Sequence, residues 1–130
     1  MVEMHHYKSL ENLCFSDFDV LGIDVDEETK MFQINLEGVW LIKNKENIKE
    51  LGHGYVKIIN FNDLKAKFSN SQSGIEGKAS IEQIKELKEI NDHEVGNNYL
   101  KIFGFIDDGS WLECKIDGGD VEANFIDLKG

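Results

Sequence analysis

NYLKIFGFIDDGSWLECKIDGGDVEANFIDL, residues 98–128, is the stretch that decides the fold. Apolar and polar residues alternate in three runs, which are separated by glycine-containing turns at residues 107–109 and 117–120. Alternation with a period of two is typical of strands that bury one face, and glycine supplies the positive φ of tight hairpin turns. The stretch therefore predicts a meander of three antiparallel strands.

The second turn predicts how the last two strands pair. Gly118 and Gly119 suit a two-residue type I′ loop, which fixes the register of the strands on either side. In that register the apolar pairs are Ile116 with Val121, Cys114 with Ala123, and Leu112 with Phe125.

The first turn leaves two registers open, because a two-residue Asp-Gly loop and a three-residue loop with Gly109 as a bulge differ by one residue. A shift of one residue turns every side chain to the opposite face. Only the three-residue loop gathers the aliphatic side chains on one face, so we expect that loop. These side chains are Leu100, Ile102, Ile106, Leu112, Cys114 and Ile116.

The other face of the predicted meander carries aromatic rings. Its large side chains are Phe103, Phe105, Trp111 and Ile126, with Tyr99 at the edge, among Lys101, Glu113, Lys115 and Glu122. A sheet face of this kind needs a cover. Two explanations stay open at this point. Either the helix or the first hairpin covers the rings as core, or the face is an open groove or a dimer interface.

The rest of the chain predicts shorter elements. Residues 6–14 predict a short amphipathic helix, and residues 18–37 predict a hairpin with an acidic turn. The alternation over residues 55–68 predicts further strands, whereas the polar residues 43–54 predict a loop with one helical turn.

Gly38 and a helix-capping motif at Ser80 predict two further elements. Gly38 precedes the apolar run Val39–Ile42, which predicts a bulge or a strand buried on both sides, with Trp40 in the core. Ser80 and Gln83 form a capping box, which predicts a helix over residues 80–90. The stripe of this helix repeats every third residue, at Ile81, Ile84, Leu87 and Ile90, so we expect the helix to lie across a sheet.

Together these patterns predict an α+β fold, mainly antiparallel sheet, with about six or seven strands and one amphipathic helix packed on the sheet. We expect one domain over residues 1–130. A chain of this length buries about two-thirds of the surface that its unfolded form exposes.

The charge of the chain narrows the classes of partner. The sequence has 25 acidic residues against 14 basic ones, all of them lysine, for a net charge of -11. Phosphate recognition relies heavily on arginine, so we expect no nucleic-acid partner. The sequence has no run of about 18 apolar residues, and residues 1–13 lack the charged n-region and apolar h-region of a signal peptide. We therefore expect a cytoplasmic protein without a membrane partner.

Motifs for metals and cofactors are incomplete. Asp24, Asp26 and Glu28 match the first ligands of an EF-hand loop, but Thr29 stands where that loop needs glycine. The four histidines show no metal-ligand spacing, and we expect Cys14 and Cys114 to be reduced core thiols. We expect no cofactor and no metal.

Catalysis by turn carboxylates is a further alternative. Asp107 and Asp108 lie at one end of the predicted meander, whereas Asp117 and Asp120 lie at the other. Paired catalytic carboxyls in glycosidases lie about 5 to 9 Å apart, whereas a five-residue strand spans about 17 Å. Turn formation already explains these aspartates, so we expect a protein that is not an enzyme.

Two segments carry a resemblance to known proteins. FSDFDVLGIDVDEETKMFQINLEG, residues 15–38, and GFIDDGSWLECKIDGGDVEANF, residues 104–125, resemble small single-domain bacterial proteins of mobile elements. Toxin-immunity proteins and orphan gene-cassette products are the groups concerned. The resemblance implies an acidic protein that acts by binding, including the capping of a basic toxin, and it transfers no residue role.

These observations favour a non-enzymatic binding module that presents an aromatic surface to a protein partner or to its own copy. The alternative is a curved sheet or barrel around a small apolar molecule, lined by Trp40, Tyr55 and Trp111. A hydrolase that uses the turn carboxylates ranks third. The candidate binding residues are Tyr99, Phe103, Phe105, Trp111, Trp40 and Tyr55.

Overall fold

The computed structural model describes residues 3–7, 10–16, 18–70, 72–106 and 109–127, with the backbone alone for residues 3–7. These residues form thirteen strands and one helix, and the strands build two five-stranded sheets and one three-stranded sheet. All neighbouring strands run antiparallel. The predicted antiparallel, strand-rich fold is confirmed, but the strands are more numerous and the helix is shorter than expected.

Each sheet combines strands from distant parts of the sequence. The first sheet has the order β1 (Glu3–Tyr7), β13 (Asp120–Asp127), β7 (Gly54–Ile59), β4 (Met31–Leu36) and β3 (Val20–Asp26). The second has the order β10 (Leu87–Gly96), β11 (Tyr99–Ile106), β12 (Trp111–Asp117), β8 (Asp63–Ser69) and β9 (Glu76–Lys78). The third has the order β2 (Leu13–Cys14), β5 (Val39–Asn44) and β6 (Asn47–Leu51).

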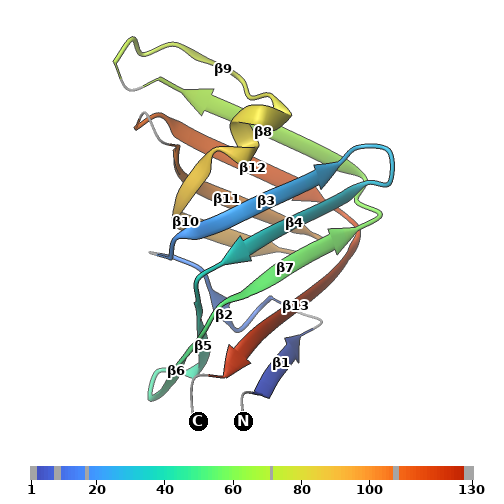
Figure 1. Cartoon of the computed structure of the whole chain (residues 1–130), viewed down its shortest axis with the longest axis vertical. Helices are drawn as coiled ribbons and strands as arrows, with labels where there is room; N and C mark the ends of the chain where they lie inside the picture. Colours follow the sequence, from blue (N-terminus) through green and yellow to red (C-terminus); the bar gives the residue numbers. More distant parts are fainter. Residues whose placement is uncertain (1–2, 8–9, 17, 71, 107–108, 128–130) are drawn as a thin grey trace.

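The hydrophobic core lies between the first two sheets, which are stacked one in front of the other (Figure 1). Successive side chains of a strand point to opposite faces, so each strand sends every second residue into this space. Phe32, Ile58 and Phe125 from the first sheet are at most 1% exposed. Leu112 and Ile116 from the second sheet are equally buried, so both sheets contribute their aliphatic faces to one core.

The predicted pairing of the last two strands is wrong. β12 pairs with β11 and β8, whereas β13 pairs with β1 and β7, so the chain crosses from one sheet to the other at Gly118 and Gly119. Both glycines have positive φ, at 76° and 90°, as a tight turn requires. In Figure 1 the red end of the chain accordingly passes from the rear sheet to the front sheet.

The three-residue form of the first turn is confirmed. Leu100 lies opposite Ile116, and Ile102 lies opposite Cys114, on the buried face of the second sheet. Gly109 has a φ of 84°, which a bulged loop requires, and the amide of Ile106 donates to the carbonyl of Ser110 across the loop. Asp107 and Asp108 lie outside the described residues.

The only helix among the described residues, α1 (Ile81–Lys85), is much shorter than the predicted segment. Its predicted capping box is present, because the Gln83 amide donates to Ser80 Oγ and the Ser80 amide donates to Gln83 Oε1. Such a cap contributes about 1 kcal/mol. From Leu87 to Gly96 the chain is strand β10, so residues 87–90 of the predicted helix belong to a strand.

Several N-terminal expectations are also corrected. Part of residues 6–14 belongs to β1 and β2, which replace the predicted short helix. Residues 43–54 hold most of the β5–β6 hairpin where a loop was expected. Trp40 is 37% exposed and is no core residue, because β5 turns only Val39 and Leu41 inward. The β3–β4 hairpin is confirmed, with an acidic turn in which Asp26 Oδ1 accepts from the Glu28 and Thr29 amides.

Candidate functional site: the aromatic face of the second sheet

Four aromatic side chains gather on the face of the second sheet that is turned away from the core. We call Tyr99, Phe103, Phe105 and Trp111 the aromatic face. The Phe105 and Trp111 rings meet edge to face with centroids 5.1 Å apart, and the Phe103 ring lies 6.0 Å from Trp111 in a stacked orientation. The rings of Phe103, Phe105 and Trp111 therefore form one cluster across β11 and β12, with Tyr99 on the same face.

The aromatic face is not covered by the two elements that were candidates for it. Helix α1 contacts β3 and buries Ile84 in the core, and the β3–β4 hairpin packs on the opposite, aliphatic side. Phe105 is 39% exposed, and the other three aromatic residues are half-buried. Ile126, expected on this face, belongs to β13 in the first sheet.

Lysines surround the rings on the same side of the sheet. Lys101 on β11 lies opposite Lys115 on β12, which in turn lies opposite Lys65 on β8. Like charges at opposite positions destabilise a sheet. Local partners offset this cost, since Lys115 lies 3.6 Å from Asp117 and 4.9 Å from the Tyr99 ring centroid, and Lys101 lies 5.6 Å from the Phe103 ring centroid.

The strands that flank the rings carry opposite charges. On β10, Glu89, Asp92 and Glu94 occupy positions opposite Phe105, Phe103 and Lys101. On the other side, β8 turns Lys65 and Lys67 outward, and Lys78 of β9 lies opposite Lys67. The aromatic face thus has the acidic strand β10 along one side and the lysine-bearing strand β8 along the other.

The aromatic face also has a hydrogen-bonded tyrosine on its β10 side and a groove on its β8 side. A hydrogen bond to Glu94 raises the pKa of the Tyr99 hydroxyl, which fixes that ring at the acidic side of the aromatic face. Beside Trp111 lies a shallow groove of about 790 Å³, whose charged lining residues are Lys65, Lys67, Lys78, Asp63, Glu76 and Glu113. The groove extends the aromatic face onto strands β8 and β9.

The sequence patterns missed the charged strands of this surface. The residues that they missed are Lys65, Lys67 and Lys78 on the basic side and Glu89, Asp92 and Glu94 on the acidic side. The alternation of β8, with Leu64, Ala66 and Phe68 between its lysines, was a sufficient signal that Lys65 and Lys67 share a face.

Trp40 and Tyr55, the other two candidate residues, lie away from this surface. Trp40 belongs to β5 in the third sheet and packs against Phe18 with ring centroids 5.6 Å apart. Tyr55 belongs to β7, where its hydroxyl accepts a hydrogen bond from Asn124 Nδ2 at 2.9 Å. Six candidate residues thus divide into one group of four and two separate positions.

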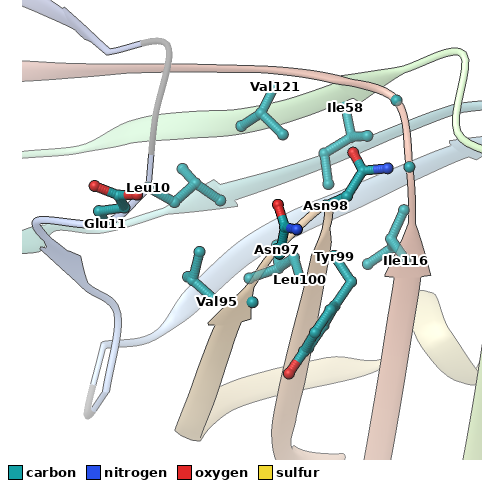
Figure 2. Close-up of a pocket in the computed structure, with 13 residues that line it drawn as sticks. Leu10, Glu11, Ile58, Val95, Asn97, Asn98, Tyr99, Leu100, Ile116 and Val121 are labelled. Atoms are coloured by element: carbon teal, nitrogen blue, oxygen red, sulfur yellow. The ribbon is translucent and has the colours of Figure 1, made fainter.

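A cleft of about 430 Å³ opens between the first two sheets at their turn end (Figure 2). Ile58 and Val121 come from the first sheet, and Val95, Leu100 and Ile116 from the second. Figure 2 shows Asn97 and Asn98 beside these apolar side chains, so the cleft combines an apolar floor with amide groups. Trp40, Tyr55 and Trp111 do not line it.

Two titratable side chains of the second sheet, Cys114 and His93, point toward the core. Burial raises the pKa of the Cys114 thiol to about 12, so this thiol stays protonated and unreactive at neutral pH. Burial lowers the pKa of His93, whose ring lies 4.7 Å from that of Phe15 and whose Nε2 lies 3.2 Å from the Leu13 carbonyl oxygen. Within the described residues, no three His, Cys, Asp or Glu side chains gather as a metal site.

Comparisons with protein-family models, curated proteins and solved structures find no match to this chain. In the described part of the chain, no helix has the length and apolar character needed to cross a membrane.

Proposed function

We propose that this chain is a non-enzymatic protein-interaction module and that the aromatic face is its contact surface. The observation that carries the proposal is the cluster of Phe103, Phe105 and Trp111 on the solvent side of the second sheet. Outward faces of antiparallel sheets are normally polar. Aromatic residues are enriched in the cores of protein interfaces, where tryptophan and tyrosine contribute most of the binding energy.

The charges around the aromatic face support a protein partner. Five of the 14 lysines point to this side of the sheet, although the chain as a whole carries a charge of -11. Interfaces of this composition have an aromatic centre and a charged rim, and the rim selects the partner and its orientation. A partner of another sequence, as for immunity proteins, and a second copy both fit this description.

The two tryptophans provide a matched test of the proposal. We expect Trp111→Ala to weaken association about tenfold, because it removes the ring that contacts both phenylalanines and leaves the core intact. Trp40→Ala removes the same ring from an exposed position in the third sheet and should leave association unchanged. The measurements are co-purification from cells that express the tagged chain and sedimentation of the purified chain. Equal behaviour of both variants at wild-type stability would refute the proposal.

The cleft between the sheets favours a second candidate function, the binding of a small apolar molecule. Its volume of about 430 Å³ lies in the range of ligand pockets. We expect the neutral dye Nile red to bind saturably and the cleft-lining substitution Val95→Trp to abolish binding. Val25→Trp, at a half-buried valine outside the cleft, is the control. If both variants bind the dye equally well, the cleft is not the binding site of the dye.

A further inference from the structure

The charges of the second sheet are arranged in order across its outer surface. The acidic strand β10 comes first, the aromatic strands β11 and β12 lie in the centre, and the lysine strand β8 follows. Glu94 shares a cross-strand row with Lys65, and Asp92 shares the next row with Lys67. The two sides of the aromatic face are therefore complementary in charge in these two rows, whereas the row of Phe105 and Trp111 runs from Glu89 to the uncharged Ser69.

We propose that the aromatic face binds a second copy of this chain, face to face, about a twofold axis that runs parallel to the strands between β11 and β12. This proposal rests on the proposed function and names its partner. A twofold axis in this position lays β10 of each copy over β8 of the other and lays β11 over β12. Such an interface is isologous, so every contact away from the axis occurs twice.

The rows then bring complementary groups together. Glu94 meets Lys65 of the second copy, Asp92 meets Lys67, and Phe105 meets Trp111, as the register of the sheet places them. Within the described residues, Lys67 forms no ion pair in its own chain, so its charge is available for this contact. The rings supply the apolar centre, and the ion pairs fix the orientation.

The area and the central lysines indicate a weak dimer. Five strands of about seven residues, spaced about 4.8 Å apart, present roughly 550 Å² per copy. A standard interface buries about 800 Å² per partner. Lys101 and Lys115 also meet each other across the axis, which lowers the affinity further. We therefore expect a dissociation constant in the micromolar range or weaker.

Charge reversal tests the arrangement. In sedimentation velocity at low ionic strength, we expect Lys67→Glu and Asp92→Lys each to weaken self-association about tenfold, because each converts two symmetric attractions into repulsions. An equimolar mixture of the two variants should associate again, since its heterodimer restores opposite charges at both contacts. Lys43→Glu and Asp24→Lys, at exposed positions outside this sheet, are controls with the same net charges.

The outcomes separate this proposal from the proposed function. A wild-type chain that stays monomeric at high concentration, or a mixture that associates no better than its components, overturns the second copy as partner. Self-association that Trp111→Ala abolishes but both charge reversals leave unchanged also overturns this arrangement, while it keeps the aromatic face as a contact surface. Self-association that is lost in each single variant and recovered in their mixture supports the arrangement, because mixing cannot repair a folding defect in either variant.

Discussion

Phe125→Ala is expected to lower the free energy of unfolding by about 3–5 kcal/mol, as for large aromatic truncations in other protein cores. Phe125 is 0% exposed, and β13 sends its ring into the space between the first two sheets. Truncation removes apolar contact and leaves a cavity that rigid neighbouring strands cannot close. Because domains are stable by only about 5–15 kcal/mol, much of the stability would be lost. Urea denaturation followed by circular dichroism measures the difference.

Phe105→Ala is the matched control for this prediction. The same atoms are removed from a strand of the second sheet, but the Phe105 ring is 39% exposed on the aromatic face. At protein concentrations where the chain is monomeric, we expect a cost below about 1 kcal/mol, close to that of other surface substitutions. Similar costs for both substitutions would contradict the placement of Phe125 between the sheets and of Phe105 outside them.

Gly104→Ala is expected to cost about 2 kcal/mol or more, although it adds a single methyl group. Gly104 faces the core between Phe103 and Phe105, and a Cβ at this position would overlap the carbonyl oxygen of Glu89 and approach Leu87 Cδ1 to 2.8 Å. Backbone cannot move aside as a flexible side chain can. The edge strand β10 would have to shift away from β11, and Glu89 would shift with it.

Gly22→Ala is the control, because a Cβ at Gly22 in β3 meets only Asn35 Nδ2, at 3.8 Å. We expect this substitution to be neutral or stabilising, since alanine loses less backbone entropy than glycine on folding. Thermal and urea denaturation of both variants give the comparison. If Gly104→Ala is as stable as Gly22→Ala, β10 does not approach β11 as closely as the structure places it.

The alternation of residues determined which faces are buried, but it did not determine which strands pair. Leu112, Cys114 and Ile116 point inward as predicted, and so do Ala123 and Phe125. Two strands with one apolar face each can bury those faces as neighbours in one sheet or as opposite members of two stacked sheets. The turn at Gly118 and Gly119 is compatible with both arrangements, because both require positive φ. Long-range packing, which no local pattern encodes, selects the second.

β-Bulges explain why the helix was predicted to be too long. Leu87, Ile90 and His93 point inward at a spacing of three residues, as on a helix. Register shifts between Leu87 and Glu89 and between Ile90 and Asp92 each insert one extra residue into β10. One bulge after each inward-pointing residue lengthens the repeat of a strand from two residues to three. A bulged strand therefore shows the same spacing of apolar residues as this predicted helix. The hairpin of β5 and β6 was missed for a different reason, because most of its residues are exposed and polar.

The aromatic face was predictable because strand parity fixes it. Once the turn at Gly109 defines the register, Phe103, Phe105 and Trp111 must point away from Leu112 and Cys114. The charged sides of the surface were not predicted, since they depend on β8 and β10 as the neighbours of β12 and β11. That neighbourhood is a property of the sheet order, which the sequence alone left open.

The position of β13 between β1 and β7 has a consequence for synthesis on the ribosome. β3, β4 and β7 leave the exit tunnel well before residue 120, so the nascent first sheet ends at β7 with the hydrogen-bonding groups of one edge unpaired. An unpaired edge is a template for strands of neighbouring molecules. Polysomes that translate this message quickly thus bring several such edges close together, and each edge is closed only when β13, which is translated long after β7, pairs with it.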